Sequence, residues 1–450
     1  MKTLLERAKA STLDIISGYE CPVGVIALFP PHTIQIRTLN FGYNHWTEIQ
    51  RFSEVNSGPL PLLRALTINA IDEFSLHRPN TMTPPTLPLF SNAVNLKEFV
   101  LHSERSPFLS HFVLPNLTAF ELSVTPTGDG FRVSELLDFL EASPMLRTVH
   151  MKVIANILLE GVPRERIVLL QDVETFSLVV NDGGPGYEIA ARISCPSVRL
   201  TSFMHERDAG DIIPREVLPD PVSWNAIARQ YTRSPVEEIS LSINADSETL
   251  IECFLTFQFR DKTVLKFHYR VAAGEEDDFM PQMPLVQLHY EVFSQASRTI
   301  KDHPLVANVK RIHINHWFIV SGSNEYPRIA DEARQLFKSV GPLEELTITL
   351  SDLYLYLGPP VDSPESHNTQ QPVVLPQIKE LNISHPLQSY NDNKRIEAIV
   401  GAVKSHHALG IPFERVIVRM ENLPTASAER LRQWVGAVDC YEEKTPDIHY

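Results

Sequence analysis

The sequence predicts an α/β fold built by repetition, with a parallel sheet on one side of each repeating unit and helices on the other. One short pattern recurs along most of the chain: an apolar anchor, two further residues, then two apolar residues separated by one. The alternation at the end of each copy is typical of a strand with one buried face. Between copies the apolar spacing is that of a helix. Such a unit cannot bury its own faces, so neighbouring units must stack.

Twelve copies of the pattern predict about twelve repeats. Most anchors lie 21 to 38 residues apart, and one interval spans 73 residues. We therefore expect a continuous repeat region over residues 36–450, preceded by an N-terminal segment at 1–35. The anchor and the two apolar residues of each copy are Ile36, Leu39, Phe41; Leu63, Leu66, Ile68; Leu96, Phe99, Leu101; Leu117, Phe120, Leu122; Leu146, Val149, Met151; Val173, Phe176, Leu178; Val198, Thr201, Phe203; Val236, Ile239, Leu241; Val309, Ile312, Ile314; Leu343, Leu346, Ile348; Ile378, Leu381, Ile383; and Phe413, Val416, Val418.

Helices are predicted where apolar residues recur at i, i+3, i+4 and i+7. Gly followed by Pro ends two helical runs just before the next strand, at Gly341 with Pro342 and at Gly410 with Pro412. Strand, turn, helix and turn is thus the expected unit. The clearest helical stripes are Val133, Leu136, Leu137, Leu140; Trp224, Ile227, Ala228, Tyr231; and Ile396, Ile399, Val400, Val403.

The interval of 73 residues predicts an insertion at about 245–300. Residues 252–259 and 263–271 alternate in hydrophobicity around the polar triplet 260–262, which predicts a β-hairpin near 250–272. An acidic loop at 275–278 follows. Two proline-rich stretches without periodicity, 78–88 and 358–372, are expected to be loops outside the repeats.

Composition excludes several classes of function. Forty Lys and Arg against 55 Asp and Glu leave a net charge of −15, which repels a phosphate backbone and argues against nucleic-acid binding. The four cysteines have no short spacing, so neither a structural zinc site nor a disulfide scaffold is expected. We find no signal peptide and no apolar stretch long enough to span a membrane. A cytoplasmic or nuclear protein without a membrane partner is the expectation.

Motifs of common catalytic chemistry are missing from the sequence. There is no GxSxG elbow, HExxH helix, GxxxxGK loop or EF-hand, so we expect no enzyme, no cofactor and no metal site. The segment 181–186 suits either an anion-binding nest or an ordinary loop after a strand. His313 and His316 stand three apart on a strand and face opposite sides, which excludes joint metal binding. His406 and His407 end a predicted helix, where their polarity suits the dipole.

The pattern resembles a leucine-rich repeat. The Asn expected three positions after the last strand residue is present only at Asn44, Asn181 and Asn244, so we predict an irregular horseshoe with the sheet on its concave side and the helices on its convex side. Residues that alternate with the apolar strand positions would then form the concave face. The candidate partner-binding residues there are Glu98, His102, Glu121, His150, Lys152, Arg311, His313, Asn315, Glu345, Glu380, Asn382, Arg415 and Arg419.

Four stretches, 5–14, 105–117, 222–229 and 411–419, resemble the F-box and leucine-rich-repeat-like proteins of mushroom-forming fungi. The resemblance implies an F-box that docks on the adaptor of a cullin ubiquitin ligase and repeats that select the protein substrate. Here residues 1–35 lack the Leu-Pro opening of an F-box, and 5–14 look like the segment that follows one. A cullin adaptor is therefore an expected partner only if an F-box lies outside this chain. The alternative is a freestanding interaction scaffold without a ligase role.

Overall fold

The structure is a computed structural model in which the chain divides into two compact units. Unit 1 comprises residues 1–206 and 222–232, and unit 2 comprises residues 207–221 and 233–450. We describe each unit by itself. The described residues are 11–17, 30–44, 46–55, 58–70, 88–104, 107–125, 130–154, 156–163, 165–181, 183–207, 227, 234–247, 250–272, 293–294, 296–298, 300–301, 309–316, 332, 335–337, 339–340, 342–349, 378–384, 392–419 and 425–441.

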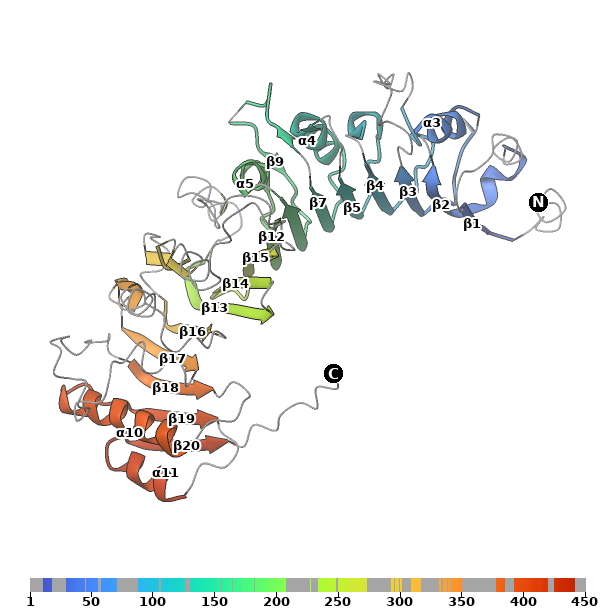
Figure 1. Ribbon diagram of the computed structural model, residues 1–450. Coiled ribbons are helices and arrows are strands. Elements are labelled where there is room, and N and C mark those ends of the chain that lie inside the picture. Colours follow the sequence, from blue (N-terminus) through green and yellow to red (C-terminus); the bar gives the residue numbers. More distant parts are fainter. Residues whose placement is uncertain are drawn as a thin grey trace, which may run out of the picture. The chain divides into compact units, whose positions relative to one another are not determined.

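The sheet of unit 1 is parallel throughout its described pairings (Figure 1). Its strands follow one another in chain order, so each new strand is added at the same edge. Two short pairs, β6 (Phe131–Arg132) with β8 (Ile157–Leu158) and β9 (Val168–Leu169) with β11 (Ile193–Ser194), lie outside this sheet. The strand order of the large sheet in unit 1 is β1 (Leu13–Ser17), β2 (Ile36–Asn44), β3 (Ala65–Ala70), β4 (Glu98–Ser103), β5 (Ala119–Val124), β7 (Thr148–Val153), β10 (Thr175–Val180) and β12 (Leu200–Arg207).

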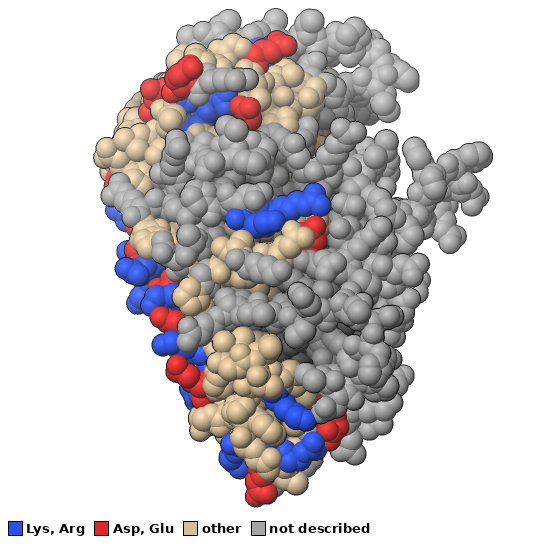
Figure 2. Space-filling view, turned by 90° about the vertical axis from the view of Figure 1, so that its left-hand side faces the viewer, with Lys and Arg blue, Asp and Glu red and all other residues tan. Residues whose placement is uncertain are grey.

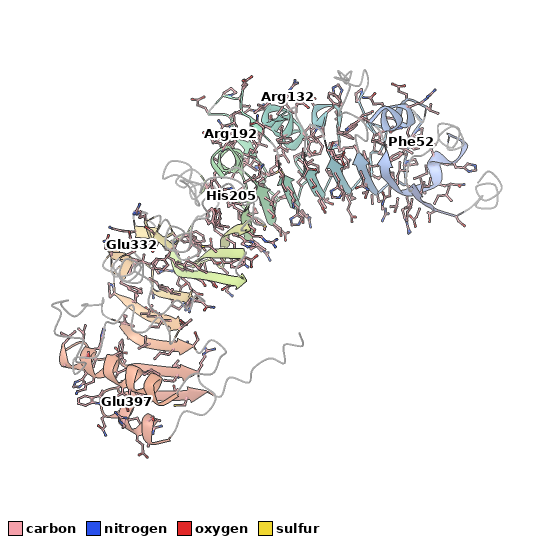
Figure 3. The ribbon with its side chains drawn as sticks, viewed as in Figure 1. Phe52, Arg132, Arg192, His205, Glu332 and Glu397 are labelled. Carbon is pink, nitrogen blue, oxygen red and sulfur yellow. The ribbon has the colours of Figure 1, made fainter. Side chains whose placement is uncertain are left out.

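Helices cover one face of this sheet, where the apolar repeat positions gather. Figure 1 shows α3 (Trp46–Val55), α4 (Val133–Glu141) and α5 (Gly183–Ala191) on the same side of the strands. Phe139 of α4 packs on Phe120 of β5 with ring centroids 4.6 Å apart. Phe52 of α3, labelled in Figure 3, meets Phe41 of β2 at 5.0 Å. Short 3-10 turns, η1 (Pro30–Gln35) and η2 (Leu109–His111), stand before β2 and β5 respectively.

A constant register keeps the repeat positions in rows. Phe99, Phe120, Val149 and Phe176 lie opposite one another on successive strands, and all are at most 1% exposed. Their burial fixes the register, because a slip by one residue would turn the polar side chains of every strand into the core.

The sheet of unit 2 is mixed. The pairs β15–β14 and β14–β13 are antiparallel, and the described pairs from β13 to β20 are parallel. The hairpin predicted near 250–272 is present, with Lys262 in the left-handed region at φ 70° and Asp261 Oδ1 accepting from Thr263 N at 3.0 Å. The order is β15 (Val264–Ala272), β14 (Leu250–Phe259), β13 (Val236–Ser247), β16 (Arg311–His316), β17 (Leu343–Thr349), β18 (Ile378–Ser384), β19 (Arg415–Arg419) and β20 (Ala437–Tyr441).

Helices α10 (Asp392–Ala408) and α11 (Thr425–Arg432) stand before β19 and β20 respectively. Ile399 and Val403 of α10 are buried, as the helical stripe predicts. Gly410 ends the run with φ 76°, a conformation in which a side chain is strained, and Ile411 N donates to His406 O at 3.2 Å. The glycine therefore turns the chain from α10 toward β19.

The α/β class and the strand positions of all twelve repeat copies agree with the sequence prediction. Besides the predicted hairpin β14–β15 and the short strands β6, β8, β9 and β11, strands β1 and β20 lie outside those copies, and β1 falls within the N-terminal segment 1–35. The segment 181–186 was expected to be a nest or a plain loop; instead α5 begins at Gly183. In the part of the chain that the structure describes, no helix is long and apolar enough to cross a membrane.

Several expectations fall on residues outside those described. They are the acidic loop 275–278 and the proline-rich stretches 78–87 and 358–372. The helical stripe that includes Trp224 also lies outside the described residues, apart from Ile227.

Candidate interaction face

The sheet of each unit has a second face, formed by the residues that alternate with the core positions. In β17, for example, Leu346 and Ile348 are fully buried, so Glu345 and Thr347 project to the opposite side. We call this side the open face. All of the candidate partner-binding residues in β4, β5 and β7 of unit 1 and in β16 to β19 of unit 2 belong to it.

The open face of unit 1 carries a dispersed polar row. Glu121 lies between Val100 and His150 in register, while His102 and Lys152 flank Ser123 one row further on. Glu98 and His150 are exposed, and His102 and Lys152 are partly exposed. The predicted residues of this unit are therefore accessible on neighbouring strands without gathering at one point.

Unit 2 brings its candidate residues into closer contact. Arg311 donates from Nε to Glu238 Oε2 at 3.0 Å, and its Nη2 lies 3.7 Å from Glu237 Oε1. His313 Nε2 lies 3.3 Å from the second carboxylate oxygen of Glu238. Two of the predicted residues thus converge on Glu238, a residue of β13 that sits beside β16 in the sheet.

Arg415 forms a second cluster at the other end of the sheet. It donates from Nη1 to Glu380 Oε2 at 3.2 Å and from Nε to Asp439 Oδ2 at 2.6 Å. Hydrogen bonding to Asp439 raises the pKa of the guanidinium above its ordinary value. Sequence reasoning missed Asp439 because β20 was not predicted, although Val435, Val438 and Cys440 repeat the spacing of an anchor and two apolar residues.

Charges alternate along the row of residues that begins these strands. Lys310 Nζ pairs with Glu344 Oε1 at 2.7 Å, and backbone hydrogen bonds link Glu237 to Lys310, Lys310 to Glu344 and Lys379 to Glu414. Acidic and basic side chains also alternate along one edge of the view in Figure 2. Opposite charges on neighbouring strands stabilise a sheet. We call this set the first row: Glu237, Lys310, Glu344, Lys379 and Glu414.

The next row, which lies on the open face, breaks this alternation. In register it runs through Glu238, Arg311, Glu345, Glu380 and Arg415, which we call the second row. Glu345 and Glu380 are adjacent carboxylates, and like charges directly opposite each other destabilise a sheet. Among the described residues, Glu345 accepts one side-chain hydrogen bond, from Thr347 Oγ1 at 3.2 Å.

The third row differs from the sequence prediction in its exposure. Asn382, a candidate residue of the concave face, and Ile417, its neighbour in register, are only 5% and 7% exposed. Asn382 Oδ1 has no hydrogen-bond partner among the described residues. Of the other predicted residues, Arg419 is exposed and Asn315 is partly buried.

Among the residues that the structure describes, no three His, Cys, Asp or Glu side chains are placed to hold a metal ion. Cys253 is buried on the core side, and desolvation raises the pKa of its thiol to about 12. The open face therefore offers charged and amide side chains for contact with another molecule.

No protein-family model matches the chain, and a search of curated proteins also gives no match.

Proposed function

We propose that the chain is a protein–protein interaction module, the substrate-recognition repeat region of an F-box-type subunit of a cullin ubiquitin ligase. The proposal includes a leucine-rich-repeat-like arrangement of its strand and helix units and residence in the cytoplasm or nucleus. The observation that carries it is the open face: successive strands in constant register present polar and charged side chains on one side while burying apolar rows on the other. Such rows suit a partner that lies across several strands.

The distribution of charge supports protein binding over catalysis. Among the described residues of unit 2, charged side chains form pairs between neighbouring strands, which gives the open face a pattern of charge that suits contact with another protein. Unit 1 adds exposed Glu98 in β4 and exposed His150 in β7, on the two sides of β5. A cullin adaptor is proposed as a second partner only where an F-box accompanies the chain.

The alternative is a freestanding scaffold without a role in ubiquitin transfer. It is favoured by β1, because part of the segment that resembles a post-F-box region is itself a strand paired with β2. The two proposals differ in what happens to the bound protein, since a ligase substrate is degraded and a scaffold partner is not.

Cross-linking and turnover measurements test both. The tagged full chain is cross-linked in cells, and cross-linked peptides are mapped by mass spectrometry. We expect cross-links from the partner to lysines of the open face such as Lys152, and loss of capture in the double variant His150→Glu, Lys152→Glu or in Arg311→Glu. A partner with a longer half-life after deletion of the gene supports the ligase role, and an unchanged half-life supports the scaffold. Cross-links confined to the helix-covered side would overturn both.

A further inference from the structure

We propose that Glu345, Glu380 and Asn382 form a binding site for a lysine side chain of the partner protein. The inference rests on the proposed function, because it names the chemistry that unit 2 recognises on its open face. These three residues lie on the adjacent strands β17 and β18, with Glu345 opposite Glu380 and Asn382 one position further along the same face of β18.

The first reason is the interruption of the charge pattern. The first row alternates acidic and basic residues across five strands, and the second row follows the same pattern until Glu380 stands where a basic residue would complete it. The arginines of the second row do not compensate both carboxylates. Among the described residues, Arg311 pairs with Glu237 and Glu238, and Arg415 divides its donors between Glu380 and Asp439. A cation from outside the chain would restore the alternation.

The second reason is the amide of Asn382. This side chain is 95% buried, and its Oδ1 lacks a donor among the described residues. A buried acceptor without a partner is costly, and few native groups remain in that state. Asn382 lies two positions after Glu380 on the same face of β18 and opposite Thr347, so its carbonyl oxygen adds a neutral acceptor in the row next to the two carboxylates.

The chemistry of the acceptors favours lysine. An ammonium group has three donors and no acceptor, which matches two carboxylates and one amide oxygen. The planar fork of arginine suits a single carboxylate, and in this structure Arg415 donates to Asp439 in this way.

A divalent cation is the main competing occupant. It is disfavoured because the described residues of this region supply only two carboxylates, and the described part of the chain contains no metal-binding group of three acidic, His or Cys residues. The test therefore includes Ca²⁺ and Mg²⁺ alone as probes.

Fluorescence anisotropy of the full chain tests the site with a labelled decapeptide of alternating serine and lysine. Controls are the same peptide with arginine and with acetyl-lysine. We expect the lysine peptide to bind at least fivefold more tightly than either control, and Glu345→Gln or Asn382→Leu to weaken it at least fivefold. Glu414→Gln is the matched control, because it removes one carboxylate from an exposed residue of the first row; its affinity should equal that of the wild type.

Thermal melting without peptide provides an independent readout. If the pair Glu345 and Glu380 lacks a compensating cation, Glu345→Gln should leave the melting temperature unchanged or raise it. A clear decrease would mean that the carboxylate is already compensated within the chain and would overturn the inference. Equal binding of the arginine peptide, or binding of Ca²⁺ or Mg²⁺ that Glu345→Gln abolishes, would overturn it as well.

The outcomes separate this inference from the proposed function. If the peptide fails to bind while a cross-linked partner still depends on the open face, only the lysine site is wrong. If cross-linking and capture of the partner do not depend on the open face of either unit, the proposed function is wrong. Peptide binding by Glu345, Glu380 and Asn382 is then a property of that site alone.

Discussion

The imidazole of His406 stacks on the ring of Phe413, with ring centroids 4.6 Å apart and planes inclined by 23°. His406 lies in the last turn of α10, and Phe413 is the anchor that precedes β19. The imidazole is 2% exposed, and desolvation lowers its pKa from the ordinary 6.5 to about 4. It is therefore neutral in the folded chain at neutral pH and belongs to the packing between helix and strand.

Burial of His406 predicts that acid destabilises unit 2. Between pH 6.5 and pH 4 the imidazole binds a proton in the unfolded chain but not in the folded one, so the free energy of unfolding falls as the pH falls. A shift of this size costs about 2 kcal/mol at pH 5. Urea denaturation gives the free energy of unfolding at pH 7 and at pH 5. The difference between these two values should be smaller in His406→Leu than in the wild type. An equal difference in both would show that other groups cause the acid sensitivity.

The strand register predicts a large loss of stability when Leu346 is shortened. Leu346 is fully buried in β17 between Ile312 and Leu381 in register, so Leu346→Ala removes apolar contacts and leaves a cavity. We expect a loss of about 2 to 5 kcal/mol in the free energy of unfolding, measured by denaturant titration. Thr347→Ala, on the open face, is the control and should lose clearly less. A reversed order would mean that the register is shifted by one residue.

Charge reversal should distinguish Arg415 from Arg419. The sequence alone suggests that both arginines are exposed and that their reversal leaves folding almost intact. The structure corrects this expectation for Arg415, which pairs with Glu380 and Asp439, so Arg415→Glu brings a third carboxylate next to two others. Its melting temperature should fall below that of Arg419→Glu, because reversal at an exposed site changes stability by only about 0.5 kcal/mol or less. Equal melting temperatures would show that the ion pairs of Arg415 add no stability.

Close packing of α5 on β10 predicts that Gly186 tolerates no side chain. A Cβ atom at Gly186 would lie 2.6 Å from the side chain of Val180. Gly186→Ala should therefore destabilise unit 1 by about 1 to 3 kcal/mol, the usual cost of overpacking. The double variant Val180→Ala, Gly186→Ala should lose less free energy of unfolding than the two single variants together, because the smaller residue at position 180 removes the clash. Full additivity in a double-mutant cycle would contradict the contact.

Thiol labelling should follow exposure. Cys440 is exposed at the edge strand β20, whereas Cys195 and Cys253 are buried and the pKa of Cys253 is raised to about 12. In a Cys21→Ser background, iodoacetamide should modify Cys440 in the native protein and the buried pair only after unfolding, as peptide mass spectrometry can show. Desolvation also raises the pKa of Cys440, so labelling should be slow at neutral pH and faster at pH 9. Early modification of Cys253 would contradict its burial.

Local periodicity was sufficient to place most of the strands and, among the described helices, α4 and α10. Leu346 and Ile348, or Val416 and Val418, alternate as a strand with one buried face must, and the apolar stripe of α4 has the spacing of a helix. These patterns depend on the geometry of a few consecutive residues, so they can be read without knowledge of the neighbours. Strand β20 carries the same pattern at Val435, Val438 and Cys440 and could have been predicted.

The sequence by itself determined the unit of this protein: which residues alternate on a strand, which form a helical stripe, and which polar residues share a face with one another. Only the tertiary structure decided that Arg415 is paired with residues 24 and 35 positions away, that Asn382 and Ile417 are buried, and that Glu345 stands beside Glu380. Strand order and register set these relationships. The charge and exposure of a side chain depend on the neighbours that the sheet brings to it across about 5 Å, and alternation along one strand carries no information about them.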